Sequence, residues 1–467
     1  MRGAVCRMVL AVASIAGWSV AGCKFPVPED VPDDGGTDDG PVVCTQDGPD
    51  PACPPEEPIC TAGTCGGACT TDQQCELRTD GRGVCLSSTG DCVTCDESDV
   101  QAPPGSAEDE CPTPSMAVCD AESRACRACE AHTECASGVC DAGTCVAVEN
   151  VVYLSEGGRD AGDCLSPETG CITLQYAIDK LTNSRKYILL LPTPIAYRAN
   201  VDDNAATFRN RNAYIVGYGA VLRPKPNVDA PVIRLESGAL VVEGLTIERA
   251  EYGSGSGIDS YAPLDLRSVT LRDNSRFGVS SAASLRITRS IVAGNRQGGI
   301  WVSSGTYQIT NNMITTNGGL EAVFGGVNIT TALGAGNRLD FNTIAFNSAH
   351  MSFPDGVSCV SAGLVARNNI IFGNVGRPRV NLADTNCVFT HTLYGPDGTV
   401  PGGDNLIVTD VLAFMFNSVT DLHILPNSVA AGKAESMNLT TDTMVDFDGD
   451  RRDPGSASLD VGADEIP

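Results

Sequence analysis

Apolar and polar residues alternate in short runs through the second half of the chain, and the alternation repeats. Four six-residue segments share a polar first residue, Ile or Val in third place and Asn in sixth place: Ser290–Asn295, Asn312–Asn317, Asn342–Asn347 and Asn369–Asn374. A fifth segment, Ser268–Asp273, ends on Asp instead. The four closing Asn residues are 22, 30 and 27 residues apart, which is the length of one coil of a solenoid.

A second series of segments follows in phase with the first. Each begins with Gly, followed by Ile or Val, and continues with alternating apolar and polar residues, which is typical of a short strand with one buried face. We expect one inward ladder, formed by Ile258, Val279, Ile300, Val327 and Val357. Each coil therefore carries at least two strands, joined by Asn or Gly, which tolerate the left-handed backbone of a tight corner. A single coil cannot bury its apolar side, but stacked coils can.

Leucine-rich repeats have a similar period and have to be excluded. Their consensus requires an apolar residue five positions before the Asn, whereas this chain has Ser290, Asn312, Asn342 and Asn369 there. The sequence therefore predicts an all-β fold, a parallel β-helix. The usual handedness of parallel crossovers predicts that it is right-handed.

The alternation also predicts which side chains face solvent on one sheet. If Ile258, Ile300 and Val327 point inward, the residue after each points outward, and the residue two places further lies along the same face. This reasoning selects Asp259, Tyr261, Trp301, Ser303, Asn328 and Thr330. Aromatic rings beside hydroxyl and amide groups are suited to stacking on sugar rings, so these six residues are candidates for glycan binding. The alternative is that they are ordinary solvent-facing residues.

The first residues have the organisation of an export signal. A basic start precedes an apolar run over Met8–Val20, which is too short to span a bilayer. The run ends in Val20-Ala21-Gly22-Cys23, which resembles the lipobox of bacterial lipoproteins. The resemblance implies that residues 1–22 are removed, that Cys23 carries the lipid and that the membrane is a partner. Because Lys24 rather than Asp follows, it also implies the outer membrane or cell surface of a Gram-negative bacterium. The alternative is ordinary cleavage after Ala21, without a lipid.

Acidic residues and cysteines dominate the stretch between the signal and the repeats. Residues 24–149 contain 26 acidic and 5 basic residues, which accounts for most of the net charge of −27 and argues against nucleic acid as a partner. Residues 23–43 are rich in Pro, Asp and Gly, and we expect a disordered acidic tether there. Sixteen cysteines then predict a disulfide stalk over residues 44–146, with eight bridges of open connectivity. The alternative is a zinc site that pairs Cys92-x-x-Cys95 with Cys126-x-x-Cys129.

The start of the repeat domain, residues 150–192, differs from the coils. An apolar run at residues 151–154 is followed by four apolar residues at helical spacing, and Thr173 is placed to cap a helix. The arrangement resembles the N-terminal cap of bacterial pectin-lyase-like β-helix proteins, in which a strand and a helix cover the first coil. We also expect two disulfides, Cys164–Cys171 in the cap and Cys359–Cys387 between two coils.

The last residues, 421–467, resemble the C-terminal signature of the choice-of-anchor Q family of β-helix proteins. The residues that fit are Asp446, Gly449, Arg451 or Arg452, Asp460, Gly462, Ala463 and Glu465. Another part of the pattern, Ser-Pro-Ala-Ile-Asp, is replaced here by Ser428-Val-Ala-Ala-Gly. The family is defined by architecture and implies no single activity.

Three carboxylates of this C-terminal region, Asp446, Asp448 and Asp450, alternate like the start of a calcium loop. Arg451 and Ala457 stand where an EF-hand needs Gly and Glu. The three Asp residues are therefore candidate Ca²⁺ ligands, with a structural turn held by Arg–Asp pairing as the alternative. No other cofactor is expected.

The motifs of polysaccharide enzymes on this scaffold are missing from the sequence. No Lys lies between Lys225 and Lys433, and no histidine has the glycine neighbours of a polygalacturonase motif. We therefore expect residues 150–467 to bind glycan or extracellular matrix without catalysis, and we name no catalytic residue. Two alternatives stay open: a polysaccharide lyase or hydrolase that uses Arg and acidic residues of the coil face, and a structural spacer.

Overall fold

The computed structural model describes residues 113–330 without a break. Before them it describes scattered residues from 48 to 111, and after them 334, 336–350, 353–359, 364–374, 387–395, 402–410, 416–436, 439–453 and 459–466. The chain divides into two units, Met1–Cys92 and Val93–Pro467. The predicted signal peptide (1–22), the lipid site Cys23 and the predicted tether (23–43) lie outside the described residues. In the part that is described, no helix is long and apolar enough to cross a membrane.

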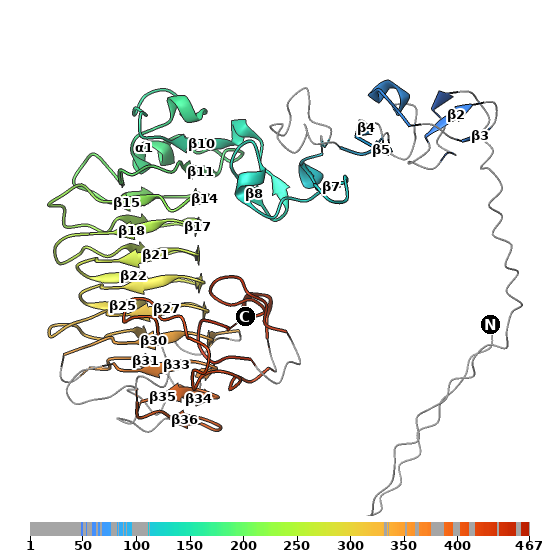
Figure 1. Cartoon of the computed structure of the whole chain (residues 1–467). Coiled ribbons are helices and arrows are strands. Elements are labelled where there is room, and N and C mark those ends of the chain that lie inside the picture. Colours follow the sequence, from blue (N-terminus) through green and yellow to red (C-terminus); the bar gives the residue numbers. More distant parts are fainter. Residues whose placement is uncertain are drawn as a thin grey trace, which may run out of the picture. The chain divides into compact units, whose positions relative to one another are not determined.

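The second unit is built on three parallel sheets that wind into a solenoid, whose stacked coils are seen in Figure 1. Among the described residues, the first sheet has ten strands: β10 (Val151–Leu154), β11 (Tyr187–Leu190), β14 (Arg211–Gly217), β17 (Gly238–Glu243), β20 (Leu264–Arg267), β23 (Leu285–Thr288), β26 (Tyr307–Thr310), β29 (Arg338–Asp340), β32 (Leu364–Arg367) and β34 (Cys387–Thr390). The second sheet also has ten: β12 (Tyr197–Arg198), β15 (Val221–Arg223), β18 (Thr246–Glu248), β21 (Thr270–Arg272), β24 (Ile291–Ala293), β27 (Met313–Thr315), β30 (Thr343–Ala345), β33 (Ile370–Phe372), β35 (Leu393–Tyr394) and β36 (Leu406–Ile407). The third sheet has seven: β13 (Ala206–Phe208), β16 (Ile233–Leu235), β19 (Ile258–Ser260), β22 (Phe277–Ser281), β25 (Gly298–Val302), β28 (Val327–Ile329) and β31 (Val357–Cys359).

The predicted inward ladder is confirmed and lies in the seven-stranded sheet. Each member pairs with the next across β19, β22, β25, β28 and β31, and none is more than 1% exposed. Apolar side chains from all three sheets meet them in one continuous core. Each buried side chain contributes roughly 1.5–3 kcal/mol relative to an exposed one. The predicted fold, a parallel β-helix, is therefore confirmed.

Two ladders of Asn side chains run through the interior beside the apolar core. In one of them, Asn295 Nδ2 donates to Asn317 Oδ1, Asn317 Nδ2 to Asn347 Oδ1, and Asn347 Nδ2 to Asn374 Oδ1, at 2.8, 2.9 and 3.0 Å. The other ladder joins Asn312, Asn342 and Asn369 in the same way. The repeated Asn thus satisfies buried polar groups from coil to coil.

Two details of the sequence prediction need correction. The left-handed corner falls on the residue before each closing Asn, which is Gly294 or Gly373 in two coils, as predicted, but Thr316 (φ 55°) or Phe346 (φ 58°) in the other two. The closing Asn itself is turned inward into its ladder. The fifth template segment is shifted by one residue, since Thr270 pairs with Ile291. Asn274, rather than Asp273, therefore continues the ladder by donating to Asn295.

The Gly that opens each strand segment is required by a close approach between coils. A Cβ on Gly299 would lie 2.5 Å from the carbonyl oxygen of Gly326 and 3.1 Å from Asn317 Nδ2. Any other residue would push the Asn ladder and the next coil apart.

A strand and a short helix stand at the start of the solenoid, where the sequence predicts an N-terminal cap. Helix α1 (Leu174–Asp179) begins at Thr173, whose hydroxyl accepts a hydrogen bond from the Tyr176 N–H, and a 3-10 turn, η5 (Pro167–Thr169), precedes it. Its apolar side chains are buried against the first coil, which closes the end of the core. Both predicted disulfides, Cys164–Cys171 and Cys359–Cys387, are present.

The cysteine-rich region consists of short strands and 3-10 turns. They are β1 (Gly48–Pro49), β2 (Ile59–Thr61), β3 (Thr64–Cys65), η1 (Asp72–Gln74), β4 (Val84–Leu86), β5 (Asp91–Val93), η2 (Pro114–Met116), β6 (Val118–Cys119), β7 (Cys126–Arg127), η3 (His132–Glu134), β8 (Cys140–Asp141), β9 (Thr144–Cys145) and η4 (Val148–Asn150). The described bridges are Cys53–Cys65, Cys69–Cys85 and Cys75–Cys92 in the first unit, and Cys95–Cys119, Cys111–Cys126, Cys129–Cys140 and Cys135–Cys145 in the second. The alternative zinc site is wrong, because all four of its cysteines are oxidised and paired with other partners.

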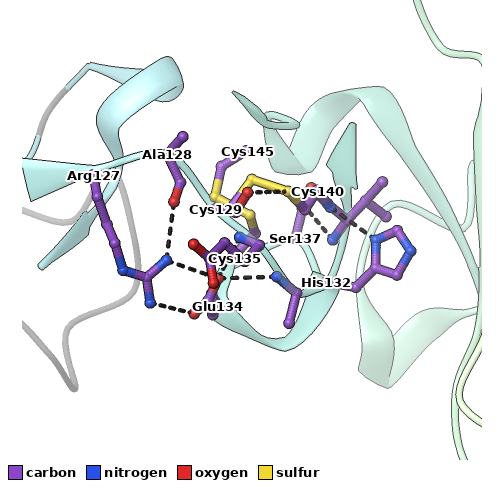
Figure 2. Close-up of a disulfide and its surroundings, with 12 residues drawn as sticks. Arg127, Ala128, Cys129, His132, Glu134, Cys135, Ser137, Cys140 and Cys145 are labelled. Carbon is purple, nitrogen blue, oxygen red and sulfur yellow. Dashed lines mark hydrogen bonds and ion pairs between the residues drawn. A yellow bond between two sulfur atoms is a disulfide. The ribbon is translucent and has the colours of Figure 1, made fainter. Parts of the chain in front are cut away.

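The last cysteine-rich module, residues 129–145, packs against the outer face of the first sheet, a contact that the sequence did not predict. Figure 2 shows its disulfides and the Arg127–Glu134 ion pair beside them. Val139 is fully buried in an apolar cluster with tyrosines of β10, β11 and β14. Tyr187 donates to Asp141 Oδ2 at 2.6 Å, and Tyr218 donates to the carbonyl oxygen of Gly138 at 2.6 Å. The module is therefore part of the second unit.

The C-terminal segment, residues 416–466, contains the short turn η7 (Thr441–Thr443) and packs along the outer face of the second sheet. Thr315 donates to the carbonyl oxygen of Val419, and the Ala463 N–H donates to Thr343 Oγ1. Arg452 is completely buried, lies over the Phe341 ring at 4.3 Å and donates to Glu465. The residues of the C-terminal signature thus fasten this segment to the coils.

Candidate functional site

A row of outward side chains crosses the seven-stranded sheet, one from each strand. Their strands pair in register, so neighbours in the row are separated by one strand spacing of about 4.8 Å. In chain order they are Thr207, Arg234, Asp259, Ser280, Trp301, Asn328 and Ser358. We call this set the outward row.

Four members of the outward row hold a buried polar atom that has no hydrogen-bond partner among the described residues. The atoms are Arg234 Nε, Asp259 Oδ1, Trp301 Nε1 and Asn328 Oδ1. An unsatisfied buried polar group costs about 1–3 kcal/mol. Four atoms of this kind thus lie in one row across one sheet, whereas the Asn ladders pair their polar groups from coil to coil.

Trp301 is held in place by aromatic contacts. Its ring meets the Phe277 ring edge-on at 5.3 Å, and Phe277 in turn stacks on Phe324 at 5.2 Å. Gly298 makes this packing possible, because a Cβ there would lie 2.4 Å from Phe324. The indole therefore has a fixed orientation at small entropic cost, as in many aromatic binding residues.

Asp259 is the buried carboxylate of the outward row. Only 6% of the residue is exposed. Burial raises the pKa of its carboxyl, and the nearby Ser256 side chain, together with the charges of Arg276 and Arg234, opposes the shift only in part. Such a group, near positive charge and without a full set of partners, is typical of a site that handles protons or polar ligands.

The outward row begins in a polar cavity of about 600 Å³ next to helix α1. Thr207 and Arg234 line it from the sheet, and charged side chains close its rim: Asp179, Asp202, Asp203, Arg209, Arg211, Asp229 and Glu236. Arg209 and Glu236 neutralise each other through a 2.6 Å ion pair. The rim therefore carries more acidic than basic groups.

Of the six predicted glycan-binding residues, the structure brings three into the outward row: Asp259, Trp301 and Asn328. The other three follow the strands and lie at the turns. Tyr261 is exposed there, whereas the hydroxyls of Ser303 and Thr330 donate to the carbonyl oxygens of Ser281 and Val302 at 3.0 and 3.3 Å. The prediction missed Arg234, although its apolar neighbours Ile233 and Leu235 show the same alternation.

The three candidate calcium ligands do not gather into one site in the described part of the chain. Asp446 Oδ1 accepts the N–H groups of Gly449 and Asp450, and its Oδ2 accepts that of Glu465. Asp448 instead faces His423. The carboxylate of Asp446 thus holds a turn.

Comparisons with known proteins identify no family for this chain. No protein-family profile matches the sequence, and no curated protein matches it either. Among solved structures, the pectate lyase Pel9A is similar with a TM-score of 0.46 and 11% sequence identity, over 68% of this chain and 96% of the lyase. The strand pairing itself establishes that the chain folds as a parallel β-helix of three sheets.

Proposed function

We propose that the outward row of the seven-stranded sheet binds a glycan chain without cleaving it. The observation that carries the proposal is the set of four unpartnered polar atoms on Arg234, Asp259, Trp301 and Asn328. Small rotations of these side chains would offer donors and acceptors to a ligand rich in hydroxyl groups. Binding would then recover the cost of leaving those atoms unpaired.

The spacing of the outward row suits a polymer. A chain laid along the solenoid meets a new strand about every 4.8 Å, so successive sugars meet successive side chains of the outward row. Trp301, held by Phe277, offers a ring on which a sugar can stack. A rigid surface of this kind loses little entropy when it binds.

The charges around the site favour a neutral glycan. Five acidic and three basic side chains line the cavity at the start of the row. A strongly anionic polymer would be repelled by the rim and by the acidic surface of the whole chain, whose net charge is −27. Neutral polysaccharides and the glycans of extracellular matrix proteins are the ligands we expect.

The test is a binding assay of the purified protein against neutral polysaccharides, acidic polysaccharides and matrix glycoproteins. Trp301→Ala and Arg234→Ala should each weaken binding by tenfold or more, which corresponds to about 1.4 kcal/mol. Gln308→Ala is the matched control, because Gln308 faces outward on β26 of the first sheet. If no glycan binds, or if the control weakens binding equally, the structural spacer becomes the better account.

A catalytic role of the same face is the second candidate, and Asp259 favours it. Its raised pKa and its neighbour Arg234 in the paired strand resemble an acid beside a positive charge. Release of reducing ends, or of unsaturated uronate absorbance, that disappears in Asp259→Asn would establish this alternative.

We further propose that the protein is exported, lipid-anchored at Cys23 and displayed at the outer membrane of a Gram-negative bacterium, as a member of the choice-of-anchor Q family. The lipobox-like Val20-Ala21-Gly22-Cys23 supports the anchor, and the disulfides support an oxidising compartment. Incorporation of a labelled fatty acid into the protein, lost in Cys23→Ala, is the expected result; a protein of unchanged labelling would contradict it.

A further inference from the structure

A cluster of one imidazole and three carboxylates lies in the C-terminal segment, apart from the outward row. His423 Nε2 is 3.0 Å from Asp448 Oδ2. An oxygen of Asp464 lies within 4.8 Å of both groups. The three residues come from separate stretches of the chain. His423 lies next to the β-bridge between Phe416 and Ile424, Asp448 lies in the turn closed by the β-bridge between Val445 and Arg451, and Asp464 lies in the last described turn.

We propose that His423, Asp448 and Asp464 bind one divalent transition-metal cation, of which Zn²⁺ is the representative. One nitrogen and two carboxylate oxygens are a usual ligand set for Zn²⁺, whereas Ca²⁺ prefers six to eight oxygen ligands. With ligand bonds of about 2.0 Å, two ligands of a tetrahedral site lie roughly 3.3 Å apart. The 3.0 Å between His423 and Asp448 is close to that separation.

The other nitrogen of the imidazole is held as metal-binding histidines usually are. His423 Nδ1 faces Asp421 Oδ1, and Asp421 is itself fixed by Asn417 Nδ2 at 3.2 Å. Phe447 packs edge-on against the imidazole at 5.5 Å. A carboxylate behind a histidine fixes the tautomer and points the opposite nitrogen at the metal.

The burial of Asp464 also indicates a cation, in addition to the grouping of the three side chains. Asp464 is 6% exposed, and one of its oxygens, Oδ2, accepts the Ile424 N–H at 2.8 Å. No further hydrogen bond to this side chain is found among the described residues. A buried carboxylate with a single hydrogen bond is poorly compensated, and a cation held between it and Asp448 would supply the missing partner.

The site is open on one side. The Asp448 side chain is 52% exposed and that of His423 is 30% exposed, so water completes the coordination. The metal would join three stretches of a segment that has little regular secondary structure. Its role is therefore to fasten the C-terminal segment, which packs on the second sheet.

The test is a titration of the purified, chelator-treated protein with ZnCl₂, with CaCl₂ and MgCl₂ in parallel, followed by calorimetry and by the melting temperature. One Zn²⁺ per chain should bind and raise the melting temperature. Asp448→Asn and His423→Gln should weaken binding more than 100-fold, because they remove ligands. Asp421→Asn should weaken it by about 10–100-fold with the stoichiometry unchanged, since it acts through His423.

Asp450→Asn is the matched control, because Asp450 lies on the same turn as Asp448 and is exposed. The proposal is overturned if Zn²⁺ does not bind at one per chain, if Asp448→Asn binds Zn²⁺ as tightly as Asp450→Asn, or if Ca²⁺ binds more tightly than Zn²⁺. Asp448 is half exposed, so its variant should fold; circular dichroism of each metal-free variant checks this. None of these outcomes depends on glycan binding.

Discussion

Asn317 is the residue whose removal tests the interior of the solenoid most directly. Its Oδ1 accepts from the N–H and the Nδ2 of Asn295, at 3.1 and 2.8 Å. Its Nδ2 donates to the carbonyl oxygen of Val292 and to Asn347 Oδ1, at 2.8 and 2.9 Å. Asn317→Ala removes all four hydrogen bonds from a site that is fully buried.

The expected cost follows from these four bonds. Each contributes about 0.5–1.5 kcal/mol net, so their loss should lower the free energy of unfolding by about 2–6 kcal/mol. The upper part of this range applies if no water reaches the former partners of Asn317, because a buried polar group without a partner costs more than a lost hydrogen bond. In a solenoid, each coil is stabilised by its neighbours, so the damage should be concentrated in the adjoining coils.

Denaturant unfolding followed by Trp301 fluorescence measures this effect. The other tryptophan, Trp18, lies in the predicted signal peptide. Asn328→Ala is the control, since it is the same substitution in the next coil at a side chain whose Oδ1 is unpartnered, and it should cost less than about 1 kcal/mol. Hydrogen exchange at the Asn295 amide should also accelerate in Asn317→Ala. Equal destabilisation by the two variants would refute the reasoning.

Three further predictions concern other parts of the chain. Arg452→Met should destabilise the C-terminal segment by about 3–5 kcal/mol, because it leaves buried acceptors unpaired; protease cleavage within residues 416–466 measures it. The Arg127 guanidinium lowers the pKa of Glu134 from 4.5 to about 2. The Arg127–Glu134 pair therefore stabilises the folded protein above pH 4.5, and this contribution is lost as the pH falls towards 2. Glu134→Gln should abolish that dependence in melting curves. Replacing both Cys359 and Cys387 by Ser removes a bridge across 28 residues and should cost about 3–4 kcal/mol in denaturant unfolding of the oxidised protein; an unchanged free energy of unfolding would contradict this.

The coils could be predicted because their chemistry repeats at short range. The coils between Gly257 and Asn374 share a small residue where backbones approach, an apolar residue beside it and an Asn that bonds to the next coil, so these types recur in the sequence. The exact register could not be predicted in the coil of Thr270, where Ser268 imitates the polar first residue of the template. Only the pairing of Thr270 with Ile291 removes the ambiguity.

Long-range contacts explain what the sequence did not disclose. The tyrosines that receive the cysteine-rich module lie on three different strands, and nothing in their local pattern distinguishes them from ordinary strand residues. The same holds for the cluster of His423, Asp448 and Asp464, which spans 41 residues of sequence. Asp448 was selected as a ligand for its spacing to Asp446 and Asp450, but its partners are set by the fold.

The way in which the three sheets are covered limits where a binding face can be. The cysteine-rich module packs on β10, β11 and β14 of the first sheet, and the C-terminal segment packs on the outer face of the second. Among the described residues, no hydrogen bond or ion pair joins either segment to a strand of the seven-stranded sheet. That sheet carries four of the unpartnered polar atoms on its outward side chains, and two others, on Thr310 and Thr390, lie in the first sheet. Tyr187 of the first sheet and Thr315 of the second instead bond to the segments that cover them. A ligand on β10, β11 and β14, or on the covered strands of the second sheet, would have to displace one of the two segments, whereas a ligand on the outward row would displace neither.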